Sequence, residues 1–377
     1  MKQSSKGARF GLKRRQVLLG LAATTLAACS GAGEPGYATR QITEADPLAR
    51  FRVHADAGES DWLAHLHAPH SANGPQVLAL SGGGEDGAFG AGALVGWSAT
   101  GRRPRFDIVT GVSTGALIAP FAFLGQSQDA VLHRIFTAHD AGDIMRLRPF
   151  QAVYSESIYD TEPLADLIET YTPPELLDDI AARHGAGGRL FIVTSDLDSA
   201  RASVWDMGAI AQAGQYDLFR GIMRASAALP GLFSPVELRY VADNTTYRET
   251  HIDGGVHMQF LAIPNYAFAT DRNLAGGHVF LLINNTLNPD PVEVSRTALG
   301  ISQQALTTMS RANAQFAVNA TRHFARANGM RLSVTSIDPN SGIVYDPSHR
   351  FSSVYMTALF QHGYLRAVDD TLWTVVQ

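Results

Sequence analysis

The sequence GVSTG, from Gly111 to Gly115, places a serine between two glycines, which is the pattern of a nucleophile elbow. The apolar segment 106–110 precedes it and predicts a strand, and the apolar segment 116–124 follows it and predicts a helix. The glycines allow a sharp turn from which Ser113 projects at the start of that helix. Because a helix N-terminus presents N–H groups and a positive dipole to an anion, the predicted chemistry is acyl transfer with Ser113 as nucleophile.

A second glycine-rich segment, VLALSGGGEDG, covers 77–87. Its residues Gly82, Gly83 and Gly84 fall at a predicted strand-to-helix turn, where bare backbone N–H groups can face an oxyanion. The segment also fits a dinucleotide-binding pattern, which requires an acidic residue about 20 residues further on, at the end of the second strand. Asp107 has that spacing but begins the second predicted strand. We therefore favour acyl transfer, which uses both glycine motifs.

The third motif is HIDGG, at 251–255, where an aspartate follows a short apolar approach. Asp253 is a candidate for the base that takes the proton from Ser113 and later returns it to the leaving group. Asp-Gly is also a common turn dipeptide, and taken alone the motif favours a turn. Following a glycine-rich turn and a serine elbow, it favours the base.

The order of these motifs resembles that of the patatin-like phospholipases, and the segment ASAALPGLFSP at 225–235 resembles the family's approach to its catalytic aspartate. The resemblance covers roughly residues 75–255. It implies hydrolysis of lipid acyl esters by a Ser–Asp dyad without a histidine. The resemblance makes Ser113 the nucleophile, Asp253 the base, the N–H groups of Gly82, Gly83 and Gly84 the oxyanion hole, and Gly87, Gly111, Gly115, Gly254 and Gly255 the remaining motif positions.

One position departs from the family pattern. The glycine turn of the family usually reads G-G-G-x-R-G, and here Asp86 stands in the arginine position. A carboxylate directed at an oxyanion would oppose catalysis. Alternatively, Glu85 and Asp86 point away and cap the following helix, where acidic side chains are favourable, and the backbone donors are preserved.

Two other functions remain open at this stage. An α/β-hydrolase with a Ser–Asp–His triad would need a histidine after the acid, and His278 and His349 are the candidates. A non-catalytic envelope lipoprotein could keep the fold for binding lipid or a partner protein. Asp86 favours this second alternative, whereas the presence of both Ser113 and Asp253 argues against it.

The N-terminus resembles an export signal. Residues 1–28 contain six basic and no acidic residues and end in an apolar run from Val17 to Ala28, which is too short to span a bilayer. The run ends in LAAC, which resembles a bacterial lipobox, and KRRQVLL at 13–19 resembles a twin-arginine signal. We expect Cys29, the single cysteine, to be lipidated and to anchor the protein in the bacterial cell envelope, at the outer membrane or on the periplasmic face.

Length and composition allow one large α/β domain or two smaller ones, and the motifs, which span most of the chain, favour a single domain. The chain has 377 residues, 45% of them hydrophobic. We expect a signal peptide at 1–28, a lipidated tether with a peripheral segment at 29–74, and an acyl hydrolase domain at 75–377. Without residues 1–28 the charge would be −11, which argues against nucleic-acid binding. The expected partners are a phospholipid or other acyl ester and the membrane.

Strand and helix patterns alternate after residue 75. This alternation predicts an α/β fold, a patatin-like three-layer α/β/α arrangement with a mostly parallel sheet and helices on both faces. Strands are predicted at 76–81, 106–111, 189–195, 202–206, 236–241, 278–284 and 331–336. Helices are predicted at 87–100, 114–124, 128–139, 161–170, 215–228, 293–327 and 353–368.

Three further expectations concern local features. Residues 191–208 predict a hairpin at the antiparallel side of the sheet, with Asp196 and Asp198 at its turn. The amphipathic segment 292–328 predicts a surface helix whose apolar side packs on the core, in preference to docking on a membrane. No metal or organic cofactor is predicted, because His65 and His67 lack acidic or cysteine partners at a convincing spacing. The apolar positions of 292–328 are Leu299, Ile301, Leu306, Met309, Phe316, Val318 and Phe324.

Overall fold

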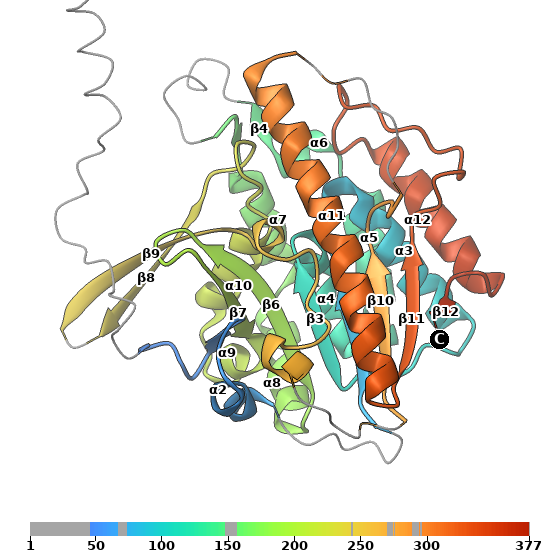
Figure 1. The fold of residues 1–377 in the computed structure, drawn as a ribbon. Coiled ribbons are helices and arrows are strands. Elements are labelled where there is room, and N and C mark those ends of the chain that lie inside the picture. The colour runs from blue at the N-terminus through green and yellow to red at the C-terminus, as the bar shows by residue number, and fades with distance from the viewer. Residues whose placement is uncertain are drawn as a thin grey trace, which may run out of the picture.

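The computed structural model describes residues 46–66, 74–147, 157–242, 244–269, 274, 276–288, 294 and 296–376. A large mixed sheet runs through the molecule in the strand order β1-β7-β6-β3-β2-β10-β11-β12, and the β8–β9 hairpin joins it through β9 beside β6 (Figure 1). The predicted signal peptide and Cys29 lie outside the described residues. So does His67.

Five parallel strands form the centre of this sheet. The register places Leu80 of β2 beside Gly111 of β3, so the glycine turn and the serine elbow leave neighbouring strands at the same edge. Residues at the carboxyl ends of parallel strands meet in this way, and this edge is where ligands bind in open α/β sheets. The central strands are β2 (Gln76–Leu80), β3 (Ile108–Val112), β6 (Arg189–Asp196), β10 (His278–Ile283) and β11 (Arg331–Ser336).

Antiparallel strands extend the sheet on both sides. The predicted hairpin at 191–208 is confirmed, since β6 pairs with β7 (Arg201–Asp206), and Asp196 accepts hydrogen bonds at the turn from Asp198 N–H and Ser199 Oγ. A strand that the pattern did not predict, β9 (Thr245–Asp253), pairs with β6 and ends at Asp253. The other antiparallel strands are β1 (Arg52–His54), β8 (Val236–Ala242) and β12 (Thr374–Val376), and a separate pair is formed by β4 (Arg146–Leu147) and β5 (Tyr159–Asp160).

Alternate side chains of the central strands face two different hydrophobic layers, as the pleat of a strand requires. Leu78 and Leu80 belong to the larger core, on the face covered by most of the helices, whereas Val77 and Ala79 belong to the core beneath α11. The predicted three-layer α/β/α fold is therefore confirmed. The helices of the larger core are α3 (Gly87–Ala99), α4 (Thr114–Leu124), α5 (Asp129–Thr137), α6 (Ala141–Ile144), α7 (Glu162–Tyr171), α8 (Pro174–Gly185), α9 (Met207–Gln212), α10 (Tyr216–Ser226) and α12 (Ser353–Val368).

The long helix α11 (Ala298–Ala327) crosses the other face of the sheet (Figure 1). The prediction that its apolar side packs on the core is only partly right. Val318 and Phe324 are buried, but Met309 and Phe316 are 68% and 76% exposed. Ile301 and Leu306 are exposed as well. Only the C-terminal part of the helix lies on the sheet, and a repeating apolar pattern does not reveal where the supporting surface ends.

Residues 46–66 belong to the folded body. Strand β1 pairs with β7 at the edge of the sheet, and α2 (Glu59–His65) places Trp62 in the core at 1% exposure. The sequence indicated only a peripheral segment here, because a strand of three residues carries no readable alternation. Within the described part of the chain, no helix is long and apolar enough to cross a membrane.

Candidate active site

Ser113 lies in a strained turn between β3 and α4. Its backbone has φ 54° and ψ −125°, a conformation that a non-glycine residue seldom adopts. The flanking glycines permit the turn, since a Cβ on Gly111 would lie 2.5 Å from the carbonyl oxygen of Gly115, and one on Gly115 would lie 2.5 Å from that of Leu80. The sequence pattern of an elbow therefore corresponds to the geometry of one.

A buried serine that sequence reasoning did not identify supports this turn. The Ser113 N–H donates to Ser226 Oγ at 3.0 Å, and Ser226 Oγ donates to the carbonyl oxygen of Val193 at 2.7 Å. Ser226 is fully buried at the end of α10. Its position within the segment 225–235 was the available signal, but its contact with the elbow depends on the packing of α10 against the sheet.

Asp253 lies at the end of β9 and faces the serine. The Ser113 hydroxyl donates to Asp253 Oδ2 at 2.6 Å, and the Gly255 N–H donates to Asp253 Oδ1 at 2.7 Å. Burial raises the pKa of Asp253 to about 6, although the hydrogen bonds from Ser113 and Gly255 act to lower it. A buried carboxylate with a raised pKa and a serine within hydrogen-bonding distance has the chemistry of a nucleophile with its base.

The glycine turn lies beside the serine. A Cβ on Gly82 would lie 3.1 Å from the Cβ of Ser113. However, the Gly82 N–H donates to the carbonyl oxygen of Gln259 at 3.1 Å and is not available to an oxyanion in this conformation. The N–H groups of Gly83 and Gly84 have no hydrogen-bond partner among the described residues. Of the three predicted oxyanion donors, these two remain.

Two further side chains hold the glycine turn. Asn284, buried at the end of β10, donates from Nδ2 to the carbonyl oxygen of Ser81 at 2.9 Å, and its own N–H donates to Ser81 Oγ. Gln259 joins the turn to the loop of the aspartate, since its Nε2 donates to the carbonyl oxygen of Gly255 at 2.8 Å. Neither residue belongs to a motif that the sequence displays.

The acidic pair in the glycine turn faces α12. Asp86 Oδ1 accepts a hydrogen bond from the Tyr355 hydroxyl at 2.6 Å, and Glu85 lies 3.6 Å from the Arg350 guanidinium. Burial, together with the Glu85 carboxylate, raises the pKa of Asp86 to about 7. The prediction that these side chains cap the next helix is wrong, because neither makes a capping hydrogen bond with α3. Asp86 is nevertheless bound by Tyr355 of α12, and Glu85 lies beside Arg350, which precedes that helix.

A buried ion-pair network supports the strand that carries Asp253. Arg52 of β1 donates two hydrogen bonds to Glu249 of β9, at 2.5 and 2.9 Å, and a further bond to Asp46. Hydrogen bonds from Arg52 and His251 hold the pKa of Glu249 well below its usual range despite burial, which raises it. The N-terminal segment 46–54 therefore helps to fix β9, a connection that no local motif predicts.

Neither proposed triad histidine reaches the dyad. His278 begins β10, at the opposite end of the sheet, and hydrogen-bonds Ser333, while His349 lies on an exposed loop beside Asp346. Asp107 directly precedes β3, and its carboxylate accepts a hydrogen bond from the Gln76 N–H. It therefore lies at the amino end of the strand and not at the ribose position that a dinucleotide site requires. Both carboxylate oxygens of Asp253 are occupied by Ser113 and Gly255.

One buried group in the described part of the chain has the residue types of a metal site, namely Asp196, Glu249 and His251. Their ligand atoms are already committed to internal partners, including Ser199, Arg52 and Thr194. The adjacent guanidinium of Arg52 would also repel a cation. His65, which the sequence left as a weak candidate, hydrogen-bonds the Ala49 carbonyl oxygen.

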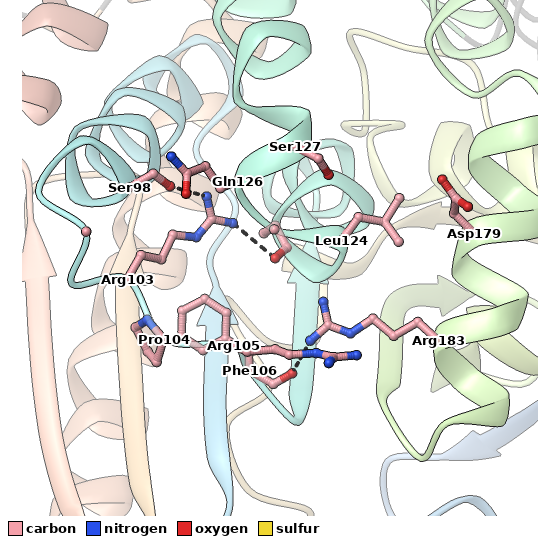
Figure 2. Close-up of a pocket in the computed structure, with 13 residues that line it drawn as sticks. Ser98, Arg103, Pro104, Arg105, Phe106, Leu124, Gln126, Ser127, Asp179 and Arg183 are labelled. Atoms are coloured by element: carbon pink, nitrogen blue, oxygen red, sulfur yellow. Dashed lines mark hydrogen bonds between the residues drawn. The ribbon is translucent and has the colours of Figure 1, made fainter.

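A small cavity lies between the glycine turn and α11. It is lined by Ser81, Gln259 and Arg311, among others. Arg311 brings to this turn a positive charge that the motif itself lacks at Asp86. A larger cavity, about 460 Å³, lies at the opposite end of β3 and does not contain any of the predicted site residues (Figure 2).

Comparison with known proteins agrees with the sequence motifs. Residues 78–264 match the family model described as patatin-like phospholipase, and this range contains the glycine turn, Ser113 and Asp253. No curated protein matches the sequence. Among solved structures, the chain is similar to the crystal structure of VipD from Legionella pneumophila, with 11% sequence identity, coverage of 82% of this chain and 70% of that chain, and a TM-score of 0.35. Through residues 78–264, the chain belongs to the patatin-like phospholipase family, a family of lipid hydrolases.

Proposed function

We propose that this protein is a serine carboxylic-ester hydrolase that cleaves lipid acyl esters with a Ser113–Asp253 dyad. The observation that carries the proposal is the 2.6 Å hydrogen bond from Ser113 Oγ to Asp253 Oδ2, made by a serine in a strained elbow. Strained backbone of this kind persists where the surrounding structure enforces it, and such positions concentrate at active sites.

In the proposed reaction, Ser113 Oγ attacks the ester carbonyl carbon while its proton passes to Asp253. The N–H groups of Gly83 and Gly84 stabilise the resulting oxyanion, a contribution of about 100-fold or more in rate for each donor. Asp253 then returns the proton to the leaving alcohol as the C–O bond breaks. A water molecule then attacks the acyl-enzyme carbonyl and gives a proton to Asp253. As the bond between the acyl carbon and Ser113 Oγ breaks, Asp253 passes this proton to Ser113 Oγ, which releases the fatty acid and restores the dyad.

The acidic residue in the glycine turn is compatible with this chemistry. The Asp86 carboxyl group is bound by the Tyr355 hydroxyl on α12, and its raised pKa leaves part of the population neutral near pH 7. Both features reduce its opposition to an oxyanion. The alternative of a non-catalytic binding lipoprotein, which Asp86 favoured, loses its main support.

The exposed part of α11 supports a substrate held in a membrane. Ile301, Met309 and Phe316 present apolar side chains to solvent, and α11 contains arginines but no acidic residue. Exposed apolar groups on a helix that contains basic and no acidic residues suit the surface of an anionic bilayer. We propose that this helix contacts the lipid surface, and that Cys29 holds the protein there as a lipid anchor in the bacterial envelope.

The dyad is tested by labelling with a fluorophosphonate probe and by hydrolysis of a chromogenic ester series. Wild-type protein should react with the probe and turn over esters, and Ser113→Ala and Asp253→Asn should do neither while remaining folded. Ser348→Ala, on an exposed loop, is the matched serine control and should behave as the wild type. Probe labelling that persists in Ser113→Ala would overturn the assignment.

The membrane contact needs a separate experiment. Met309→Ser combined with Phe316→Ser should reduce sedimentation with vesicles containing an anionic phospholipid and slow their hydrolysis, whereas hydrolysis of a soluble short-chain ester should be unchanged. Val375→Ser, an exposed valine on the edge strand β12, is the control. Equal vesicle binding by the double variant and the wild type would contradict a role for α11.

A further inference from the structure

The larger cavity lies at the amino end of β3, at the opposite end of the strand from the elbow. It is bounded by the segment that leads into β3, by the end of α4 and by α8, and it has a volume of about 460 Å³. Ser113 lies seven positions after Phe106, which lines this cavity, and this spacing corresponds to about 20 Å along extended strand. The cavity is therefore a different site from the proposed dyad.

Three arginines line this cavity (Figure 2). Arg103 is held rigidly, because it donates to Ser98 Oγ, to the Ala122 carbonyl oxygen and to Asp129, with which it forms an ion pair at 2.9 Å. Among the described residues, Asp129 is the single carboxylate paired with any of the three arginines.

Arg183 reaches the cavity from α8. Its guanidinium lies 4.3 Å from the centre of the Phe123 ring and donates to the Phe106 carbonyl oxygen at 2.6 Å. Its Nε is buried and has no hydrogen-bond partner among the described residues. Burial, together with the positive charges of Arg105 and Arg103, lowers the pKa of Arg183 to about 10, although the Asp107 carboxylate acts to raise it. The side chain is thus fixed in place and its charge is incompletely compensated.

Arg105 adds a second uncompensated charge. It is exposed and makes no hydrogen bond or ion pair with the part of the chain that the structure describes. Asp179, on α8, is the acidic residue in the lining, and it forms no ion pair with these arginines. Gln126 and Ser127 add further polar side chains to the same cavity. Like charges held around one cavity repel one another, and an anion bound between them relieves that repulsion.

We propose that this cavity binds a phosphate-type anion between the guanidinium groups of Arg105 and Arg183. Planar guanidinium groups with several N–H donors match the oxygens of a phosphate group and form charge-assisted hydrogen bonds with it. The cavity volume exceeds that of an inorganic phosphate and leaves room for a substituent, so the phosphate can belong to a small phosphomonoester or to the headgroup of a lipid.

The first experiment uses inorganic phosphate and the full-length protein. Phosphate should raise the Tm of the wild type more than sodium chloride at equal ionic strength, because a ligand that binds only the folded state stabilises it. Arg105→Gln should reduce this shift, and adding Arg183→Met should abolish it. Arg201→Gln is the matched control and should keep the full Tm shift. Arg201 begins the distant strand β7 and forms an ion pair with Asp56.

Two variants keep the test decisive if Arg183→Met impairs folding. Arg105 makes no internal hydrogen bond within the described residues, so Arg105→Gln should fold normally. Asp179→Asn removes the carboxylate from the lining and should strengthen phosphate binding, a change of opposite sign. A phosphate-dependent Tm shift that is absent in the wild type, or that is equal in the wild type and Arg105→Gln, would overturn the proposal.

A second arm distinguishes the two sources of phosphate. Calorimetric titration with glycerol 3-phosphate reports a soluble phosphomonoester, and sedimentation with phosphatidylcholine vesicles containing phosphatidic acid reports a lipid headgroup. If binding of glycerol 3-phosphate or sedimentation with these vesicles depends on Arg105 and Arg183, the result supports the site and identifies the source of the phosphate. If neither measurement depends on the two arginines, the proposal is refuted. Because the readouts are binding and Tm, failure here leaves the Ser113–Asp253 proposal intact, and the reverse also holds.

Discussion

The two ends of strand β3 differ in how far the charges of the surrounding side chains are compensated by hydrogen bonds and ion pairs. At the carboxyl end, Asp253 is buried, its two oxygens are both hydrogen-bonded, and Asp86 of the glycine turn is bound by Tyr355 of α12. At the amino end, Arg105 and Arg183 line a cavity that also contains Asp179, and neither arginine forms an ion pair with a carboxylate of the described residues. One end is closely hydrogen-bonded around the proposed dyad, and the other holds the positive charge on which the proposed anion site rests.

In our proposals, one strand serves two sites. The elbow needs Ser113 and Asp253 at fixed positions, so hydrogen bonds hold both residues, and a Cβ on Gly111 or Gly115 would clash with backbone oxygens. The arginine cavity needs space, and the chain leaves it where α4 and α8 end around the segment before β3. The larger cavity therefore lies away from the proposed reaction centre.

The largest expected effect lies at the carboxyl end. Ser113→Ala and Asp253→Asn should each lower kcat/KM for ester hydrolysis by about 10⁴-fold or more, because nucleophile and base act as a unit. The double variant should be no worse than either single one, and this non-additivity is measured with the same ester. Residual activity that falls further in the double variant would indicate that the two residues act separately.

The buried support of β9 should give the next largest effect. Arg52→Met removes the partner of Glu249 and of Asp46, and leaving a buried carboxylate unpaired costs about 3–5 kcal/mol of unfolding free energy. Urea unfolding measures this loss. Arg102→Met, which removes an exposed arginine paired with Asp370, is the control and should cost about 1 kcal/mol or less. Equal losses for the two variants would argue against the Arg52 network.

Ionisation of Asp253 should lower the free energy of unfolding. Its pKa is raised from 3.8 to about 6, so the folded state binds the proton more tightly than the unfolded state, and stability is lost as the pH rises from about 4 to 6. The Asp253→Asn variant does not titrate, so its stability relative to the wild type should increase by about 2 kcal/mol between pH 4 and pH 7.

Urea unfolding at several pH values tests this, with Asp56→Asn as control. Asp56 is mostly exposed, and its hydrogen bond and ion pair with Arg201 lower its pKa despite partial burial, so its small effect should have the opposite sign. The same titration should lower kcat/KM of the wild type below about pH 6, because the base must be ionised. A constant stability difference between wild type and Asp253→Asn would contradict the raised pKa.

The smallest expected effect concerns the positive charge at the carboxyl end. Arg311→Met should lower kcat/KM by about tenfold if its guanidinium stabilises charge near the glycine turn, which corresponds to about 1.4 kcal/mol. Arg311→Lys should recover part of the loss, since the charge is retained. Arg326→Met, near the end of the same helix, is the control. Equal effects of Arg311→Met and Arg326→Met on kcat/KM would show that Arg311 has no specific role at the glycine turn.

The sequence by itself determined the elements with strong local patterns. The five central strands and the helices that follow the glycine turn and the elbow were predicted within a few residues, because a buried parallel strand is a continuous apolar run bounded by turn residues. The positions of Ser113 and Asp253 were also readable, since glycine-flanked turns require particular residues. Strand β9 was missed, because its polar sequence TTYRETHID lacks an apolar alternation.

Only the tertiary structure decided which distant residues support the site. Ser226, Gln259 and Asn284 reach the elbow and the glycine turn through packing between elements, and no spacing in the chain encodes those contacts. The direction of Asp86 depended on Tyr355, 269 residues away. Likewise, the exposure of Met309 and Phe316 follows from where the sheet ends beneath α11. Local patterns fix backbone conformation, whereas burial and charge compensation depend on which surfaces meet.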